Sequence, residues 1–563
     1  MAVAATVVCL ALYVLGYRLY ARYLSDRVFS LADDVTTPAH ELRDDVDFLP
    51  THKAVLFGHH YASITGLSPM LGPAIAVIWG WLPAMVWVVF GALLIGCVHD
   101  FSALVLSLRA RGLSVGAIAE GIIGARAKTM FHLVIFFGIA LAMGVFVSVI
   151  ATLFTPSFYP QAIGPSFLLM ALAIGVGLAV HARGVSPGVP VAVAFTLTVL
   201  AVAWSASAAP VVSWDDRDGW GAVLLVYSFA ASVLPVWVLL QPRDFINSLL
   251  LYLGVALMYA GFFVIAPSFA SPAVVAEPPG APPLFPFVFV VIACGAVSGF
   301  HGLVSSGTTS KQIDRPTDAR AIGYGGMIGE SLLGLMAVLA CTAGFSSPEG
   351  WSEHYATWSS ADSLGAKIGV FIDGSAGFVA GLGLPLELGR ALIAVVVVSF
   401  ALTTLDSATR LLRYNITEMA ATVGFERENR FLTSFLAVVV IGFFAFYKVD
   451  GRPVGLALWG LFGTTNQLLA SLTLTMVTVY LMQRGRNCWV TAVPAALMTG
   501  TTLVAMTTNL GRFWDEGQTL LFAVGAVLLV LAVGILIEGL ARIRAALGAP
   551  PIDSLFVFAP DDR

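Results

Sequence analysis

Seven ionisable residues lie within long apolar runs of this sequence, where groups that can carry a charge are uncommon. They are His59, His60, His99, Asp100, His301, Glu330 and Asp406. A charged side chain at the centre of a bilayer costs about 2.5–3.5 kcal/mol or more, so such residues usually face a partner or a polar path. Imidazoles and carboxylates in that setting can relay protons, hold an ion or form structural ion pairs.

Most of these residues have a structural explanation beside the functional one. His59 and His60 are adjacent, so on a helix they point about 100° apart and do not easily bind one ion together. They either belong to a pathway or lie at the membrane interface. His99 and Asp100 fit an ion pair as well as a proton relay, and Glu330, about two turns into its run, fits an interfacial position.

Asp406 lies in a polar patch. It precedes Arg410 by four residues, so an ordinary pair on one helix is the default explanation. Its neighbours Thr403, Thr404 and Ser407 raise the alternative that this face lines a cavity.

Two polar strings interrupt other apolar runs. Residues 299–309 contain His301, Ser305, Ser306, Thr308 and Thr309, and residues 463–467 contain Asn466 and Gln467. Small polar residues usually join packed membrane helices. Their oxygens could equally bind a hard cation such as sodium.

Helix-breaking residues interrupt two further runs, at residues 66–73 and 230–235. The two runs lie five apart, the separation at which an inverted five-helix repeat places its two broken helices. The exposed N-terminus of a half-helix attracts an anionic group such as a carboxylate, although Pro and Gly also merely kink packed helices. The predicted substrate-binding residues are Gly66, Ser68, Gly72, Ser232 and Pro235, with His60.

Composition identifies the solvent that surrounds these groups. The chain is 58% hydrophobic and 11% charged, against about 25% charged in ordinary soluble domains, so lipid must cover most of its surface. A net charge of -4 without a long basic run makes nucleic acid an improbable partner. The five cysteines show no paired spacing, which predicts buried free thiols and makes a disulfide framework or a zinc site improbable.

A membrane span needs about 20 mostly apolar residues, and by this measure the sequence contains about 15 spans. They are 2–21, 54–81, 83–107, 130–155, 164–181, 188–209, 219–240, 248–268, 285–307, 322–345, 388–409, 432–447, 454–482, 489–508 and 519–541. Residues 22–53 form a charged linker, and residues 269–284 a Pro- and Ala-rich outer loop.

The loop charges orient this map. With the N-terminus outside and the C-terminus in the cytoplasm, most of the 29 Lys and Arg residues fall on the cytoplasmic side, as the positive-inside rule requires. The exceptions are Arg217, Lys367, Arg390, Lys448, Arg452 and Arg512. Counting the weakly apolar stretch 366–385 as a span would reverse this bias downstream, so we interpret it as an external or re-entrant element.

Several of these strings together resemble the carbon starvation protein A family, which includes bacterial peptide and pyruvate transporters. The resemblance is carried by residues 57–61 (Phe-Gly-His-His-Tyr) with 66–73, 98–102 (Val-His-Asp-Phe-Ser), 298–301 (Ser-Gly-Phe-His) with 306–309, 402–406 (Leu-Thr-Thr-Leu-Asp) with 409–410, and 463–470. These motifs cover most of the chain.

The resemblance implies an all-α inner-membrane protein with a leucine-transporter-like inverted repeat. The expected plan is an anchor helix and linker (1–53), a core (54–412) with repeats 54–209 and 219–412, and accessory helices (413–563). In that architecture the eighth core helix supplies hydroxyls to a cation site beside the first broken helix. Matching it to the span 285–307 makes Ser305, Ser306, Thr308 and Thr309 cation candidates, with Asp406 as a further coupling residue.

The expected function is ion-coupled uptake of a small carboxylate-bearing nutrient, a short peptide or pyruvate, with no enzyme activity, no bound metal and no cofactor besides a coupling proton or sodium ion. Two alternatives stay open. A membrane redox or metal enzyme would use facing histidines, but the nine histidines show no repeated spacing. A nutrient sensor would signal through a partner, but no soluble signalling domain fits between the spans. The sequence does not determine the oligomeric state.

Overall fold

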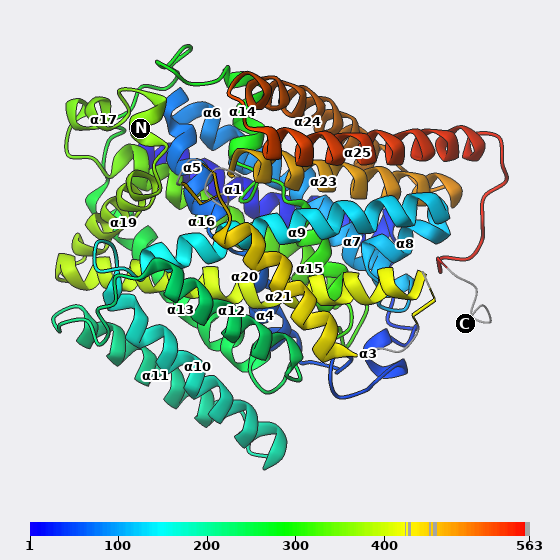
Figure 1. The fold of residues 1–563 in the computed structure, drawn as a ribbon, viewed down its shortest axis with the longest axis horizontal. Helices are drawn as coiled ribbons and strands as arrows, with labels where there is room; N and C mark the ends of the chain where they lie inside the picture. Colours follow the sequence, from blue (N-terminus) through cyan, green and yellow to red (C-terminus); the bar gives the residue numbers. More distant parts are fainter. Residues whose placement is uncertain (423, 426–428, 450–451, 454–458, 558–563) are drawn as a thin grey trace.

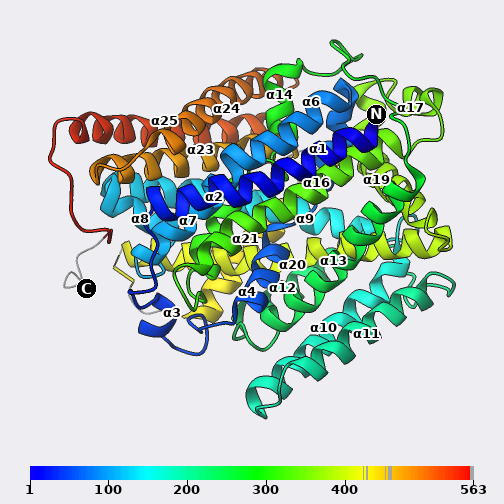
Figure 2. The same cartoon turned by 180° about the vertical axis from the view of Figure 1, so that it is seen from behind.

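The fold is a bundle of long helices lying side by side (Figures 1 and 2). It was obtained as a computed structural model that describes residues 1–563 except 423, 426–428, 450–451, 454–458 and 558–563. In the described part, ten helices are long and apolar enough to cross a membrane, or up to eleven if one bent pair is a single span. The strands described there, β1 (Lys448–Val449) and β2 (Arg452–Pro453), form one short antiparallel pair. The predicted all-α class is confirmed.

Each of the predicted runs falls on a helix or on a pair of helices. In chain order these are α1 (Ala2–Leu15), α4 (Lys53–Ile64) with α5 (Ser68–Ala76), α6 (Trp81–Val86) through α7 (Cys97–Arg109), α9 (Ala125–Leu153), α10 (Ile163–Gly177), α11 (Gly188–Ser205), α12 (Arg217–Val233), α13 (Leu240–Ile265), α14 (Leu284–Val291) with α15 (Gly299–Val304), α16 (Gly325–Ala343), α20 (Leu386–Thr422), α21 (Arg430–Phe446), α23 (Trp459–Gln483), α24 (Trp489–Asp515) and α25 (Thr519–Ala546). The first residues of the run 454–482 lie outside the described residues. The number of 15 crossings stays a prediction.

Shorter helices connect these elements. They are α2 (Ala21–Tyr23), α3 (Pro38–Glu41), α8 (Val115–Ile122), α17 (Pro348–His354), α18 (Trp358–Ala361) and α19 (Leu364–Ala380). The stretch 366–385, predicted to be external or re-entrant, lies largely on α19, which packs on α13, α16 and α20 and is not among the candidate spans.

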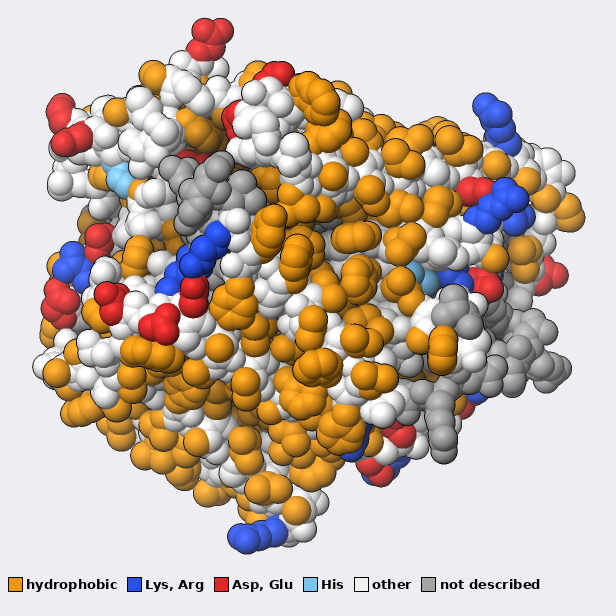
Figure 3. Space-filling view, viewed as in Figure 1, with side chains coloured by type: hydrophobic (Ala, Val, Ile, Leu, Met, Phe, Trp, Pro, Cys, Tyr) orange, Lys and Arg blue, Asp and Glu red, His pale blue; other side chains and the backbone are white. Residues whose placement is uncertain are grey.

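The surface explains how this bundle is solvated. Hydrophobic side chains cover most of the middle of the face in Figure 3, and charged side chains gather mainly toward its two ends. Helices α10 and α11 form a hairpin at one edge of the bundle, and α23, α24 and α25 pack together at another (Figures 1 and 2). With its apolar helices, this distribution is that of a multi-pass membrane protein.

The first predicted helix break is present but shorter than expected. Helices α4 and α5 meet at 47°, and the residues between them are Thr65, Gly66 and Leu67. Residues 68–73 are helical, because Pro69 lies in the first turn of α5, where a missing N–H costs no hydrogen bond.

The second break lies in another span than predicted. Helix α12 ends at Val233, and Leu234 is extended, as a residue before proline prefers. The turn that follows packs on the linker, where Val236 N donates to Val46 O at 3.1 Å. The break within a span instead separates α14 from α15, and its residue Gly295 has φ +85°.

The two broken helices pack directly against each other. A Cβ atom on Gly72 of α5 would lie 2.5 Å from Val291 O and 3.2 Å from Ile292 Cα. Gly295 approaches Pro69 in the same way, with contacts of 3.4 Å. The two breaks are therefore neighbours, and glycine is required where the backbones approach.

We expect Gly72→Ala to destabilise the protein by about 1–3 kcal/mol, the usual cost of inserting a methyl group into a packed interior. The matched control is Gly500→Ala in α24, where a Cβ meets nothing within 4 Å. Apparent melting temperatures of the two variants in one detergent would test this. Equal melting temperatures would contradict the close contact.

Helices of the two halves pack in equivalent ways. In the first half, α13 and α16 pack on the broken helix α4. In the second half, α23 and α7 pack on the broken helix α15 in the same way. This pattern favours other repeat boundaries than the predicted 54–209 and 219–412, because the hairpin α10–α11 lies outside it.

Candidate binding site at the helix breaks

The first break is held by hydroxyl groups of α20. Thr403 Oγ1 donates to Ala62 O at 3.0 Å, and Thr404 Oγ1 donates to Ser63 O at 3.4 Å. Both carbonyls belong to the last turn of α4, where no intrahelical N–H is available. The predicted polar patch on α20 therefore lies beside the break.

Two buried hydroxyls at this break have no hydrogen-bond partner among the described residues. They are Thr65 Oγ1 at the end of α4 and Ser68 Oγ at the start of α5. The first N–H groups of a helix carry a partial positive charge. Gly66, between the two hydroxyls, lies against Phe146 and Thr404, so the break combines open hydrogen-bonding groups with an apolar wall.

The second break is held by the string that contains Asn466 and Gln467. Asn466 Oδ1 accepts from Phe300 N at 2.9 Å, and its Nδ2 donates to Ser298 Oγ at 3.1 Å. Gln467 Nε2 donates to Phe289 O in α14. Both residues, predicted as polar pathway residues, therefore satisfy backbone or side-chain groups around this break.

A buried charge network joins α4, α12, α13 and α20. Arg243 pairs with Asp244, Nη2 to Oδ1 at 2.5 Å, and with Asp406. Tyr227 Oη donates to Asp406 Oδ2 at 2.5 Å, and His59 Nδ1 lies 2.7 Å from Asp244 Oδ2. Ser63 extends the network to Ser407 at 2.9 Å. Asp406 thus pairs with Arg243 rather than with Arg410, the default partner four residues on.

A second buried network joins α7, α15 and α16. Asp100 lies between two imidazoles, 2.8 Å from His99 Nδ1 and 2.9 Å from His301 Nδ1. His301 Nε2 is 3.1 Å from Glu330 Oε2, an ion-pair distance. The predicted pair of His99 and Asp100 is present, and Glu330 is fully buried within the protein.

The hydrogen bonds described for the hydroxyls predicted to bind a cation do not reach residues 65–67 of the first break, and their cation role stays a prediction. Residues 305–309 are π-helical, and Ser306 and Thr308 donate to carbonyls one turn back in their own helix, at 2.7 and 3.1 Å. Ser305 Oγ is without a partner in the described part, and Thr309 Oγ1 lies 2.8 Å from His60 Nδ1. The hydroxyls beside the first break belong to α20, because the helices α10–α11 shift the count of core helices.

Ser232 and Pro235 do not join the first break. Ser232 Oγ donates to Phe229 O in its own helix at 2.9 Å, and the turn at Pro235 contacts the linker. The proline there ends a helix instead of breaking one, and the role of these two residues in substrate binding stays a prediction.

Sequence reasoning missed Arg243 and Asp244 and interpreted Cys294 only as an inert thiol. The first two fall between the predicted runs 219–240 and 248–268, but α13 begins at Leu240 and buries both. Two adjacent opposite charges directly before an apolar run were the available signal. The five cysteines are free, as predicted.

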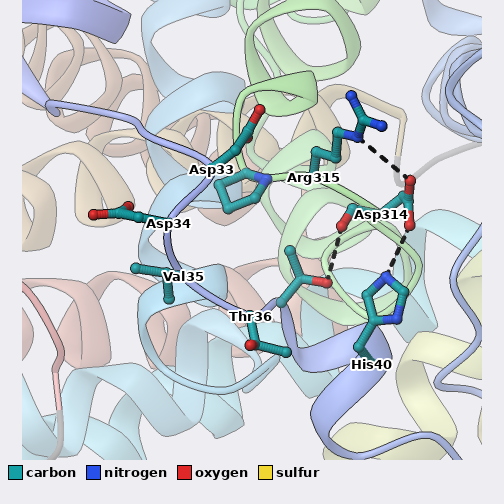
Figure 4. Close-up of a pocket in the computed structure, with 9 residues that line it drawn as sticks. Asp33, Asp34, Val35, Thr36, His40, Asp314 and Arg315 are labelled. Atoms are coloured by element: carbon teal, nitrogen blue, oxygen red, sulfur yellow. Dashed lines mark hydrogen bonds and ion pairs between the residues drawn. The ribbon is translucent and has the colours of Figure 1, made fainter.

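A separate surface cavity of about 430 Å³ lies between the linker and the loop after α15 (Figure 4). It is lined by Asp33, Asp34, Val35, Thr36, Thr37, His40, Asp314, Arg315 and Pro316. His40 Nε2 lies 2.8 Å from Asp314 Oδ1 and joins the two segments. This cavity is lined by residues of the linker, including His40 on α3, and of the loop after α15, and by none of the residues of the two breaks.

Known proteins resemble most of the chain. The family model described as carbon starvation protein CstA matches residues 1–348 and 353–505. Among curated relatives, the peptide transporter CstA of Campylobacter jejuni is 31% identical over 92% of this chain and 82% of its own. The pyruvate/proton symporter BtsT of Escherichia coli is 31% identical over 87% of this chain and 79% of its own.

The fold also matches a solved structure. A manganese transporter from Eremococcus coleocola, solved in a mutant form, aligns over 90% of this chain and 99% of its own. The TM-score is 0.50 and the sequence identity is 11%. The predicted leucine-transporter-like fold is confirmed.

Proposed function

Because the chain belongs to the carbon starvation protein CstA family, we propose that it is an ion-coupled secondary transporter. It imports a small carboxylate-bearing nutrient, a short peptide or pyruvate, across the bacterial inner membrane, with its N-terminus outside and its C-terminus in the cytoplasm. The relatives named above are a peptide transporter and a pyruvate/proton symporter. They do not favour the alternatives of a redox enzyme or a sensor.

The observation that carries this proposal is the contact between the two broken helices. Gly72 lies against Val291 and Ile292, and Thr65 and Ser68 present unpartnered buried hydroxyls beside the N-terminus of α5. A substrate carboxylate would accept hydrogen bonds from these hydroxyls at the positive end of α5. The hydroxyls matter here because Pro69 has no N–H and because Met70 N and Leu71 N already donate to Leu67 O. Gly66 and Ser68 stay in the proposed site and Thr65 joins them, whereas Gly72 allows the close contact of the two broken helices.

Coupling would use groups next to this site. Asp406 remains the coupling candidate, and Thr403 and Thr404 replace the residues 305–309 as the hydroxyls nearest the first break. The proposed repeats are residues 53–265 and 284–483, with the hairpin α10–α11 inserted in the first. Rocking of one set of helices against the other would alternate access to the breaks.

Uptake into proteoliposomes tests the proposal. Purified protein is reconstituted, and accumulation of labelled pyruvate and of a labelled dipeptide is measured under an imposed proton gradient, an imposed sodium gradient and no gradient. We expect gradient-dependent accumulation of one substrate class. Failure of both substrates under both gradients, with protein that is folded and correctly inserted, would contradict it.

We expect Ser68→Ala to raise KM for the transported substrate about tenfold or more, because a hydrogen bond to a charged group contributes about 1.5–3 kcal/mol. The matched control is Ser166→Ala, which removes another buried hydroxyl without a described partner, from α10. Initial uptake rates measured against substrate concentration give the KM of each variant. An unchanged KM in Ser68→Ala would exclude this hydroxyl from the site.

A further inference from the structure

Three side chains of different chemistry converge inside the bundle, at the second break. They are Cys294 in the turn between α14 and α15, His301 on α15 and Glu330 on α16, and one donor atom of each lies within 4.8 Å of the others. His301 and Glu330 are fully buried, and Cys294 is 6% exposed. A thiol, an imidazole and a carboxylate form the donor set of zinc sites in proteins.

Three of the polar atoms at this cluster lack hydrogen bonds. His301 Nε2 and both carboxylate oxygens of Glu330 have no hydrogen-bond partner among the described residues. A buried polar group without a partner costs free energy, so their convergence calls for a ligand. Bonds of about 2.0–2.3 Å place the ligand atoms of a tetrahedral zinc ion about 3.3–3.8 Å apart. The 3.1 Å between His301 Nε2 and Glu330 Oε2 is already close to that spacing.

The surroundings orient these donors as they do in metal sites. His301 turns its other nitrogen, Nδ1, to Asp100 Oδ2 at 2.9 Å, and Asp100 is in turn fixed by His99 at 2.8 Å. A carboxylate behind a ligating histidine sets the tautomer that leaves Nε2 free for a metal. Asn466 Nδ2 donates to Cys294 Sγ at 3.4 Å, and Cys294 Sγ donates to Ser298 Oγ at 3.4 Å, so two polar neighbours fix the position of the sulfur.

We propose that Cys294, His301 and Glu330 bind a divalent transition-metal ion of the zinc type. The thiolate and the carboxylate of Glu330 neutralise its two charges, which a buried site requires, and the fourth position is open to water. The ion ties the turn at the second break to α16, so it stabilises the bend between α14 and α15. This proposal departs from the expectation drawn from cysteine spacing, since its ligands come from two helices and a turn.

Cobalt binding tests the site without any transport assay. The full chain, purified with an affinity tag that contains no histidine and treated with a chelator, is titrated with Co²⁺ and then with Zn²⁺. We expect one equivalent of Co²⁺ per chain, visible bands of a tetrahedral ion, a near-ultraviolet thiolate-to-cobalt band, and displacement by Zn²⁺. The alternative is a protonated His301 held between Asp100 and Glu330, which predicts no stoichiometric binding.

Variants identify the ligands. We expect Cys294→Ser to remove the thiolate band, Glu330→Gln to weaken binding at least tenfold, and Asp100→Asn to weaken it about 10–100-fold. The control Cys341→Ser changes another buried thiol, on the same helix as Glu330, and should bind like wild type. The proposal is overturned if wild type binds no ion, if its cobalt form lacks the thiolate band, or if Cys294→Ser retains it. Should a variant fail to fold, the wild-type spectrum decides.

Discussion

Replacing Arg243 with methionine should abolish uptake and destabilise the protein by about 3–5 kcal/mol, the usual cost of breaking a buried ion pair from one side. Arg243 is 1% exposed and pairs with Asp244 and Asp406, both fully buried. Methionine fills a similar volume but leaves two carboxylates in a low-dielectric interior. Uptake in proteoliposomes and the apparent melting temperature in detergent measure the two effects.

Two further variants separate charge from geometry. Arg243→Lys keeps the charge but not the planar guanidinium group that reaches both carboxylates and Tyr227. Its uptake and its melting temperature should therefore lie between those of wild type and Arg243→Met. The control Arg126→Gln alters a guanidinium that is 89% exposed and 3.8 Å from Glu538, and should change stability by less than about 0.5 kcal/mol.

A double-mutant cycle completes this test. Adding Asp406→Asn to Arg243→Met removes one of the stranded carboxylates, so the double variant should be more stable than the sum of the two single effects predicts. A melting temperature at the additive value would show that the two side chains do not interact. Wild-type uptake by Arg243→Met would contradict the role of the network altogether.

The helices were predictable because the signal for them is local. A span is recognised from about 20 consecutive apolar residues, and the predicted runs fall on helices. The second break was not predictable in this way, because a proline such as Pro235 gives the same local sequence pattern at the end of a helix as within one. The break between α14 and α15 contains no proline and depends on Gly295 and on contacts with α5, which no local pattern contains.

The residues of the site were easier to identify than their partners. His59, His301 and Asp406 were singled out because charges are rare in apolar runs. Their partners lie far along the chain: Asp244 is 185 residues from His59, and Tyr227 is 179 from Asp406. Only the fold brings them together, so the sequence assigned Asp406 to its neighbour Arg410 and left Arg243 in a loop.

Arg410 does not pair with Asp406 and instead helps to hold the linker to one end of the bundle. Its Nη1 lies 2.8 Å from Asp47 Oδ1, and its Nη2 donates to Ala231 O at 2.9 Å. Arg413 lies 3.2 Å from the other oxygen of Asp47. One carboxylate therefore connects the linker before α4 with α20 and, through Arg410, with α12.

We expect Asp47→Asn to weaken this connection by about 3 kcal/mol, which corresponds to a factor of about 100 in its equilibrium constant. Maximal uptake should fall severalfold or more, because the linker is then held less firmly to α20 and α12. The control Asp45→Asn removes a neighbouring linker carboxylate that is 62% exposed and paired with Arg43, and should change little. Equal behaviour of the two variants would refute a special role for Asp47.

The pH dependence gives this connection a second test. Burial alone would raise the pKa of Asp47, but the guanidinium groups of Arg410 and Arg413 and the ammonium of Lys311 hold that pKa well below its ordinary value. A lowered folded pKa means that the stabilisation is complete above the unfolded pKa, about 3.9, and is lost only as the pH falls through the lower folded pKa. The difference in melting temperature between wild type and Asp47→Asn should therefore be constant from pH 5 to pH 8. A difference that shrinks across that range would show that Asp47 is not the ionised partner of these arginines.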